Sequence, residues 1–344
     1  MSEGKLRHLI VPIFIPNQGC PHRCVFCEQE RITSTSGRGV NGAHIAEVLN
    51  TAIRSRGFDP RRNPEVAFYG GTFTGLPLDK AREYLKAVGP YMEKGLFRSI
   101  RVSTRPDAID EDLLEILKDH GVLTVELGVQ SMDDSVLSLS QRGHTAGDTV
   151  RAVEILKKMG FRVGIQLMPG LPGDTKERFR STITRVIDLN PDMVRLYPAL
   201  VIRGTALARW YKEGRYVPLE TGEAVDICTD SCIRLESQGI PVIRIGLMSS
   251  PTLLEKGQIL AGPWHPAFGF LVRSGMHHIK IEPDLPGPGK FSRIRLRVPQ
   301  REIPLLRGYK NQGLDLIENK IKAKIARVMA DETVPSGRVR VEEV

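Results

Sequence analysis

Short apolar runs alternate with amphipathic stretches over the first two thirds of the chain. Apolar runs bounded by turn residues are typical of buried strands, and apolar positions repeated every three or four residues are typical of helices. Their alternation predicts a parallel sheet with crossover helices. The expected strands are Leu9–Ile15, Glu65–Tyr69, Ser99–Ser103, Leu123–Leu127, Arg162–Leu167 and Met193–Tyr197, and the expected helices are 43–55, 78–93, 110–120, 146–159 and 174–188.

This number of strands is two short of a closed eight-stranded barrel. We therefore predict an α/β fold, a partial (β/α)6 TIM-like barrel. Turn residues follow two of the expected strands, at Pro106-Asp107 and at Gly170–Asp174. Because ligands of such folds sit at the carboxyl ends of the strands, we expect the functional site there.

The pattern changes after about residue 220. A helix is expected from Thr221 to Gln238, then an apolar run over Ile240–Ile245, a Gly/Pro/His-rich stretch over 262–289, and a last helix near 311–330. We predict a core domain over residues 1–220 and a smaller α+β extension over 221–344. The extension is expected to close the barrel and to contribute to binding of substrate or RNA.

Composition and charge narrow the class of protein. Of 344 residues, 41% are hydrophobic and 26% charged, which is ordinary for a soluble globular chain. There is no run of 18 apolar residues and no signal-peptide pattern at the start, so we expect a cytoplasmic protein without a membrane segment. The net charge of +9 suggests an anionic partner. Seven basic residues against the single acid Glu302 between Lys290 and Lys310 supply two thirds of that excess.

Three of the five cysteines, Cys20, Cys24 and Cys27, fall in one short loop after the first expected strand. Clustered cysteines in a reducing compartment are more often metal ligands than disulfides. Three thiolates on a [4Fe–4S] cluster leave one iron open to another ligand. Structural zinc, with His22 or a distant residue as the fourth ligand, is the alternative, although the second knuckle of the usual zinc signature is missing. Three unliganded buried thiols are the remaining interpretation.

The spacing C-x-x-x-C-x-x-C, with Phe26 before the last cysteine, resembles the signature of radical S-adenosylmethionine (SAM) enzymes. The resemblance implies that SAM chelates the open iron. It also implies that an external one-electron donor reduces the cluster, and that SAM is then cleaved to a 5′-deoxyadenosyl radical. In this chemistry the protein positions and shields the cofactors.

Further motifs at successive strand ends resemble the same family. They begin at Phe68, Ser103, Val125, Arg142 and Gly164. The resemblance implies that Gly70, Gly71 and Thr72 approach the SAM amino group, although many members carry Glu at the position of Thr72. By position, Gln130 and Gln166 would face the ribose and Arg142 the SAM carboxylate. The full set of expected cofactor-binding residues is Phe26, Gly70, Gly71, Thr72, Thr104, Gln130, Arg142, Gln166 and Met168.

Taken in order, these strings most resemble the radical SAM half of the catalytic subunit of Elongator and its shorter bacterial relatives. The likeness covers about residues 8–217 and implies an RNA substrate, tRNA. Two departures matter, because the cysteine loop is shorter than that of Elongator and 344 residues leave no room for its acetyltransferase domain. Acetyl transfer and the wobble-uridine reaction are therefore not expected from the resemblance.

Four other features carry weaker signals. The string Gly37-Arg-Gly39-Val-Asn-Gly42 matches a dinucleotide fingerprint but lacks the preceding strand, so a loop leading into a helix is favoured. Cys228 and Cys232 share a helix face, where buried small hydrophobes are favoured. The histidines of the Gly/Pro/His-rich stretch are candidate substrate residues, His265, His277 and His278, and a packed loop is the alternative for residues 262–269.

The last of the weaker signals is the alternating segment around Arg293, Arg295 and Arg297. As a strand it would place these arginines on one face, about 6.7 Å apart, a spacing that suits successive phosphates of a nucleic acid. The alternative is a solvated edge strand whose charges block aggregation.

The sequence leaves three candidate functions. The first is an Elongator-like radical SAM enzyme acting on RNA. The second is a radical SAM enzyme acting on a small molecule or peptide. The third is a zinc-stabilised nucleic-acid-binding module without catalysis.

Overall fold

A curled sheet of seven parallel strands forms the centre of the computed structural model, which describes residues 9–34 and 39–344. The order is β1-β2-β3-β4-β5-β6-β8. Because neighbouring strands are parallel, their carboxyl ends meet at one edge. The strands are β1 (Ile10–Phe14), β2 (Glu65–Tyr69), β3 (Ser99–Thr104), β4 (Val122–Gln130), β5 (Arg162–Leu167), β6 (Met193–Leu196) and β8 (Val242–Ile245).

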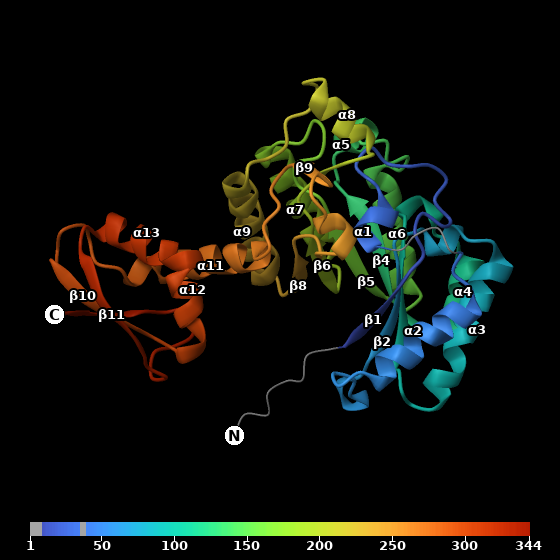
Figure 1. The fold of residues 1–344 in the computed structure, drawn as a ribbon, viewed down its shortest axis with the longest axis horizontal. Coiled ribbons are helices and arrows are strands. Elements are labelled where there is room, and N and C mark those ends of the chain that lie inside the picture. Colours follow the sequence, from blue (N-terminus) through green and yellow to red (C-terminus); the bar gives the residue numbers. More distant parts are fainter. Residues whose placement is uncertain (1–8, 35–38) are drawn as a thin grey trace.

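Helices follow the strands and cover the outside of the sheet, as Figure 1 shows for α2, α3 and α4. The described α-helices that precede β8 are α1 (Gln29–Thr33), α2 (Gly42–Arg54), α3 (Leu78–Glu93), α4 (Glu111–Asp119), α5 (Asp134–Leu139), α6 (Ala146–Lys158), α7 (Lys176–Leu189), α8 (Ala206–Lys212) and α9 (Thr221–Ser237), of which α1 lines a cavity at the carboxyl edge. The predicted partial TIM-like barrel is confirmed. The sequence pattern predicts six strands, and the structure adds a seventh, β8, which is formed by the apolar run after residue 240.

Local sequence explains where the helices begin. The Thr145 hydroxyl accepts from the backbone N–H of Asp148, whose carboxylate accepts from the N–H of Thr145, and this reciprocal capping box starts α6. Asn41 caps α2 in a similar way through the N–H of His44. Apolar faces of these helices pack on the sheet to form the main hydrophobic core, which includes Tyr84 of α3 and Leu156 of α6.

A second, smaller hydrophobic core lies in the extension. It is built by α11 (Phe268–Ile281), α12 (Ile303–Arg307), α13 (Gln312–Ile321) and a sheet in the order β11-β10-β12. The strands are β10 (Arg293–Val298), β11 (Lys324–Ala330) and β12 (Arg340–Glu343). The main core includes side chains up to Met276, and the second core begins at Ile281. The division at residue 220 remains a prediction. The hydrophobic cores themselves change between Met276 and Ile281, within α11.

Two expectations for the extension are wrong. The helix expected near 311–330 ends at Ile321, because Lys322 has a left-handed backbone (φ 52°), and the residues from Lys324 onward pair with β10 as a strand. The segment of Arg293–Val298 is a strand as expected, but it is the middle strand of its sheet. The alternative of a protective edge strand therefore fails.

A short pair, β7 (Val201–Ile202) and β9 (Ile259–Ala261), lies beside α10 (Pro251–Leu254) near the carboxyl edge of the main sheet. The dinucleotide-like string begins at Gly37, which lies outside the described residues. Among the described helices, none has the length and apolar character needed to cross a membrane.

Candidate active site

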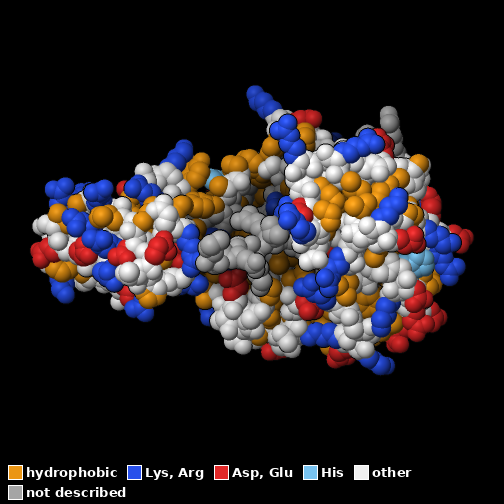
Figure 2. Space-filling model, turned by 90° about the horizontal axis from the view of Figure 1, so that it is seen from below, with side chains coloured by type: hydrophobic (Ala, Val, Ile, Leu, Met, Phe, Trp, Pro, Cys, Tyr) orange, Lys and Arg blue, Asp and Glu red, His pale blue; other side chains and the backbone are white. Residues whose placement is uncertain are grey.

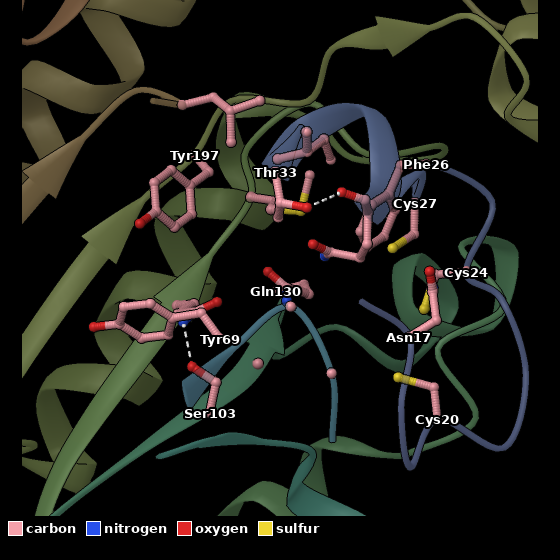
Figure 3. A pocket seen from close by; sticks show the side chains of 18 of the residues that line it. Asn17, Cys20, Cys24, Phe26, Cys27, Thr33, Tyr69, Ser103, Gln130 and Tyr197 are labelled. Carbon is pink, nitrogen blue, oxygen red and sulfur yellow. Dashed lines mark hydrogen bonds between the residues drawn. The ribbon is translucent and has the colours of Figure 1, made fainter. Parts of the chain in front are cut away.

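A cavity of about 460 Å³ lies at the carboxyl ends of the main sheet. Its lining brings together Cys20, Cys24 and Cys27. It also includes the full set of residues expected to bind the cofactor: Phe26, Gly70, Gly71, Thr72, Thr104, Gln130, Arg142, Gln166 and Met168. Figure 3 shows the cysteines along one side of the cavity, Tyr69 and Tyr197 on the opposite side, and Gln130 between them. Residues far apart in the sequence therefore form one site.

The cysteine loop is anchored from two directions. The backbone N–H of Val25 donates to the carbonyl of Ser140 over 3.2 Å, and the carbonyl of Val25 accepts from the N–H of Leu207 over 2.8 Å. The Val25 side chain is fully buried, and Phe26 packs against two apolar clusters below the loop. Because the residues between Cys24 and Cys27 are fixed in this way, both thiols are directed to the cavity.

Glycines allow the cysteine loop to pack directly on the loop after β2. A Cβ atom on Gly71 would lie 2.5 Å from the carbonyl oxygen of Gln18 and 2.6 Å from that of Ile15. A Cβ atom on Gly19 would lie 2.1 Å from the carbonyl oxygen of Thr72. The glycine motif thus has a structural reason here, close approach of two backbones, in addition to the approach to SAM that the resemblance implies.

The donor set of the three thiols fits a cationic cluster. Burial and the neighbouring Cys24 raise the pKa of the Cys27 thiol to about 12. Three thiolates that line one cavity carry more negative charge than one arginine balances, and an iron–sulfur cluster would supply the remaining positive charge. Cys24 accepts a hydrogen bond from Arg142, and Cys20 lies 3.2 Å from the Thr72 hydroxyl.

The arrangement does not favour zinc. Four ligands on one tetrahedral zinc bring sulfur atoms to about 3.8 Å from one another. Within residues 9–34 and 39–344, no three His, Cys, Asp or Glu side chains gather closely enough to hold one metal ion. His22, the proposed fourth ligand, instead places its Nε2 atom 2.9 Å from the carbonyl oxygen of Gln141. Cysteines that each bind a different iron of a cluster can stand further apart.

Two of the expected SAM contacts have a buried polar atom without a partner among the described residues. They are Nε of Arg142 and Oε1 of Gln130. Gln130 ends β4 with a left-handed backbone (φ 69°), beside an irregularity in the pairing of β4 with β5. Buried polar groups are normally paired, so these two atoms suit a polar ligand in the cavity. Gln166 differs, because its amide nitrogen already donates to Glu126 over 3.0 Å.

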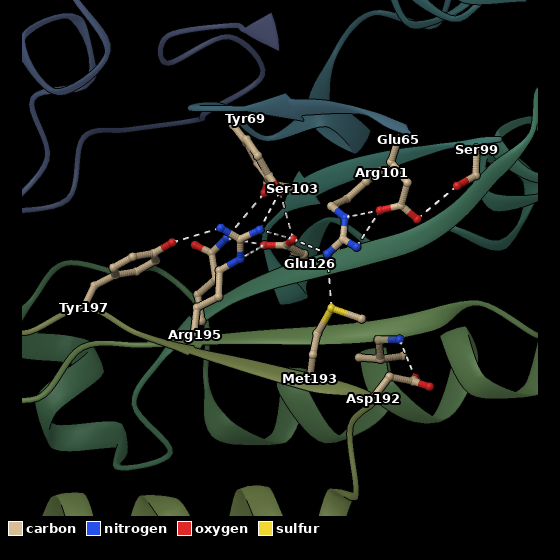
Figure 4. A network of polar contacts seen from close by, with 12 residues as sticks. Glu65, Tyr69, Ser99, Arg101, Ser103, Glu126, Asp192, Met193, Arg195 and Tyr197 are labelled. Carbon is tan, nitrogen blue, oxygen red and sulfur yellow. Dashed lines mark hydrogen bonds and ion pairs between the residues drawn. The ribbon is translucent and has the colours of Figure 1, made fainter. Parts of the chain in front are cut away.

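The wall opposite the cysteines rests on a buried ionic network that the sequence did not predict (Figure 4). Glu126 of β4 accepts from Arg101 over 2.7 Å, from Arg195 over 2.8 Å and from the Tyr69 hydroxyl over 3.0 Å. Glu65 pairs with Arg101 at 2.6 Å. Two acids thus balance two bases inside the barrel, and burial with the nearby Glu126 raises the pKa of Tyr69. The motif around Val125 contained Glu126, but nothing in it indicated which charges it would meet.

The network fixes part of the cavity lining. Tyr69, Gln166 and Arg195 line the cavity, and each donates to Glu126. The hydroxyl of Tyr197, also in the lining, accepts from Arg195 over 3.1 Å. One buried carboxylate therefore sets the positions of several cavity side chains.

The candidate substrate residues of the extension do not reach the cavity. His265 contacts the ring of Tyr309 edge-on, with ring centroids 4.7 Å apart. Nδ1 of His277 lies 3.7 Å from a Glu302 carboxylate oxygen, and His278 bonds the carbonyl of Leu306 over 2.9 Å. His277 and His278 join α11 to the segment of Glu302 and Leu306, whereas His265 precedes α11, and a role of the three in contacting substrate stays a prediction. The arginines of β10, Arg293, Arg295 and Arg297, also lie in the extension.

Cys228 and Cys232 are fully buried in α9 and belong to the main hydrophobic core, as predicted. Burial raises the pKa of the Cys232 thiol to about 12 and holds that of Cys228 well above its usual value. Both thiols are therefore packing groups.

Comparison with known proteins agrees with this geometry. A protein-family model described as "Radical SAM superfamily" matches residues 14–186, half of the chain. A second, described as "Radical_SAM C-terminal domain", matches residues 191–278. The matches confirm the resemblance drawn from the motifs.

Relatives of named function are similar to this chain over part of their length. The tRNA uridine(34) acetyltransferase of Methanocaldococcus infernus is 28% identical over 256 residues, covering 63% of this chain and 48% of that protein. Human Elongator complex protein 3 is 32% identical over 185 residues, covering 47% of this chain and 34% of the relative. The chain spans about half the length of the first of these curated relatives.

A solved structure has the same fold. The archaeal Methanocaldococcus infernus Elp3 with an N-terminal deletion aligns with a TM-score of 0.62 at 22% identity, covering 79% of this chain and 64% of that chain. This likeness concerns the fold alone.

Proposed function

The chain belongs to the radical SAM superfamily, and from that premise we propose that it cleaves SAM reductively at a [4Fe–4S] cluster and modifies RNA, specifically tRNA. Cys20, Cys24 and Cys27 would hold the cluster. Members of the superfamily use this cluster and SAM, which together supply a 5′-deoxyadenosyl radical that takes a hydrogen atom from the substrate. The observation that carries the proposal is the convergence of the three thiols and the expected SAM contacts on one cavity.

The chain's own residues have separate tasks in this proposal. Arg142 would compensate the negative charge at Cys24 with one nitrogen of its guanidinium and hold the SAM carboxylate with its unpartnered Nε. The buried Oε1 atom of Gln130 would accept a hydrogen bond from a ribose hydroxyl. The mostly apolar walls around Phe26 and Met168 would exclude water from a reactive intermediate.

The proposal of an RNA substrate has two supports. The relatives named above include a tRNA uridine(34) acetyltransferase, and the chain carries a net charge of +9. Acetyl transfer is not part of the proposal, because the chain matches only about half of that relative. A small-molecule or peptide substrate is the second candidate, since none of the arginines of β10 lines the cavity.

The test is anaerobic reconstitution followed by incubation with SAM, dithionite as the one-electron donor, and bulk tRNA. A brown protein with about four iron atoms per chain that forms 5′-deoxyadenosine is the expected result. Formation should increase when tRNA is present. Iron loading and SAM cleavage without any response to tRNA would favour the small-molecule candidate, and tight zinc binding without SAM cleavage would favour the non-catalytic module.

A further inference from the structure

The sheet of the extension has one buried and one solvent-facing side. Along β10, Ile294, Leu296 and Val298 are buried in the second core. Because side chains alternate along a strand, Arg293, Arg295 and Arg297 lie on the opposite side. Only the tertiary structure reveals what stands beside them.

Pairing with the outer strands adds two more arginines to that side. Arg295 is the ladder partner of Arg327 on β11 and of Glu342 on β12, and Arg297 is the partner of Arg340. Residues directly opposite in a ladder share a face. We call this set the arginine face: Arg293, Arg295, Arg297, Arg327 and Arg340.

Acidic residues orient only part of the arginine face. Glu342 contacts Nε of Arg297 at 2.7 Å and Nη1 of Arg295 at 3.4 Å, and Asp331 contacts Arg340 at 3.2 Å. Five arginines against these two acids leave three positive charges. No ion pair within the described residues involves Arg293 or Arg327. Figure 2, with the extension at its left, shows basic side chains spread over it with acidic ones between them.

The geometry points to the arginine face as a binding site for the phosphate backbone of RNA, at a distance from the reacting nucleotide. Guanidinium groups match phosphate oxygens in shape and charge. The three strands contain no aromatic residue, so the face has no platform for stacking bases. Contact would therefore be largely independent of sequence and strongly dependent on salt.

The place of the arginine face favours a large ligand. It belongs to a unit with its own hydrophobic core, which projects from the barrel beyond α11 (Figure 1). None of its arginines lines the cavity. A small substrate inside the cavity gains nothing from this surface, whereas a long polyanion can reach both. The inference rests on the proposed RNA substrate and gives it a second point of contact.

The test compares two double charge reversals in the full-length chain. Arg293→Glu with Arg327→Glu changes the arginine face at two residues whose side chains make no hydrogen bond or ion pair with any described residue. Arg82→Glu with Lys86→Glu makes the same change in net charge on the exposed surface of α3. Binding of fluorescently labelled bulk tRNA is measured by anisotropy over a range of salt concentrations. Iron content and unfolding temperature are measured for each protein.

We expect the first pair to weaken binding at least tenfold near 100 mM salt and to reduce the slope of log K against log salt by about two. The α3 pair should weaken it less than about threefold. A third variant, Glu342→Gln, removes an acid from the arginine face and should strengthen binding about two- to threefold, an effect that misfolding does not produce.

The outcomes separate the two proposals. If the unmodified chain binds tRNA and the Arg293/Arg327 variant binds equally well, the arginine face is refuted while the RNA function stands. Equal losses in both double variants, or weaker binding by Glu342→Gln, also refute the face. If the unmodified chain has no affinity for tRNA, the proposed RNA function itself fails.

Discussion

The Nη1 atom of Arg142 lies 2.9 Å from the Sγ atom of Cys24, although the two residues are 118 positions apart in the sequence. Arg142 follows α5, and Cys24 lies in the loop after β1. A second guanidinium nitrogen donates to the carbonyl of Gly128 at the end of β4. The arginine therefore joins the cysteine loop to the strand end that carries Gln130.

Replacing Arg142 tests whether this side chain binds SAM or supports the cysteine loop. Arg142→Ala should weaken SAM binding by about 10- to 100-fold, because a charge-assisted hydrogen bond is removed from a buried site. Iron content should stay near that of the unmodified protein. Equilibrium dialysis with labelled SAM measures the SAM affinity, and iron analysis measures the iron content of the same protein. Loss of iron would show instead that Arg142 mainly supports the thiols.

The cysteines divide into two groups with different expected behaviour. Alanine at Cys20, Cys24 or Cys27 should abolish formation of 5′-deoxyadenosine and reduce iron content. The matched control is Cys228→Ala, which removes a fully buried thiol of the main core instead of one that lines the cavity. It should retain iron and lose about 1–2 kcal/mol of stability. SAM cleavage by any of the three loop variants would overturn the cluster assignment.

Gly71 should be intolerant of a methyl group. Gly71→Ala places a Cβ atom against two backbone carbonyls of the cysteine loop and should lower the free energy of unfolding by about 1–3 kcal/mol. Gly222→Ala in the first turn of α9 is the control, because a Cβ there meets no atom within 4 Å beyond its neighbours in the chain. That helical substitution should stabilise the protein by about 0.5–1 kcal/mol. Denaturant titration compares the two, and equal effects would contradict the packing argument.

The buried network should be sensitive to loss of one charge. Glu126→Gln leaves Arg101 and Arg195 with a single acid, Glu65, and should cost about 3–5 kcal/mol of stability. Glu213→Gln removes an exposed partner of Arg215 and should change stability by less than about 1 kcal/mol. Urea unfolding is the measurement. A Glu126→Gln protein as stable as the control would mean that the network adapts.

His144 should contribute to acid sensitivity. Burial, helped by the nearby Arg142, lowers the pKa of His144 from 6.5 to about 3. Between those values the unfolded chain binds the proton and the folded chain does not, so stability decreases as the pH falls below 6.5. The contribution is about 1 kcal/mol per pH unit between pH 6 and 4.

The comparison for His144 is made by denaturant unfolding across that pH range. His144→Gln should lose less stability on acidification than the unmodified chain. His44→Gln, at an exposed position of α2, should behave like the unmodified chain. If both variants lose as much stability on acidification as the unmodified protein, His144 is not the group that causes the acid sensitivity.

Local sequence was sufficient for most of the barrel. The strands over Glu65–Tyr69 and Arg162–Leu167 and the helix over 78–93 were predicted with the bounds that the structure gives them. Apolar runs, capping residues and turn residues act within a few positions, so they can be recognised without knowing the fold. The helix expected near 311–330 was wrong in its second half because Ile325 and Val328 pair with β10 and pack against the second core, non-local interactions that their spacing does not reveal.

By itself, the sequence determined the chemistry at the cavity, because the cysteine spacing and the glycine, glutamine and arginine motifs are local. It also determined that the arginines of β10 share one face, since side chains alternate along any strand. Only the tertiary structure decided that Glu126 meets Arg101 and Arg195, that β10 is a central strand, and that Arg327 and Arg340 stand beside it. Which charges pair and which strands lie side by side depends on burial and hydrogen bonding between segments far apart in the chain. Local residue spacing does not encode those contacts.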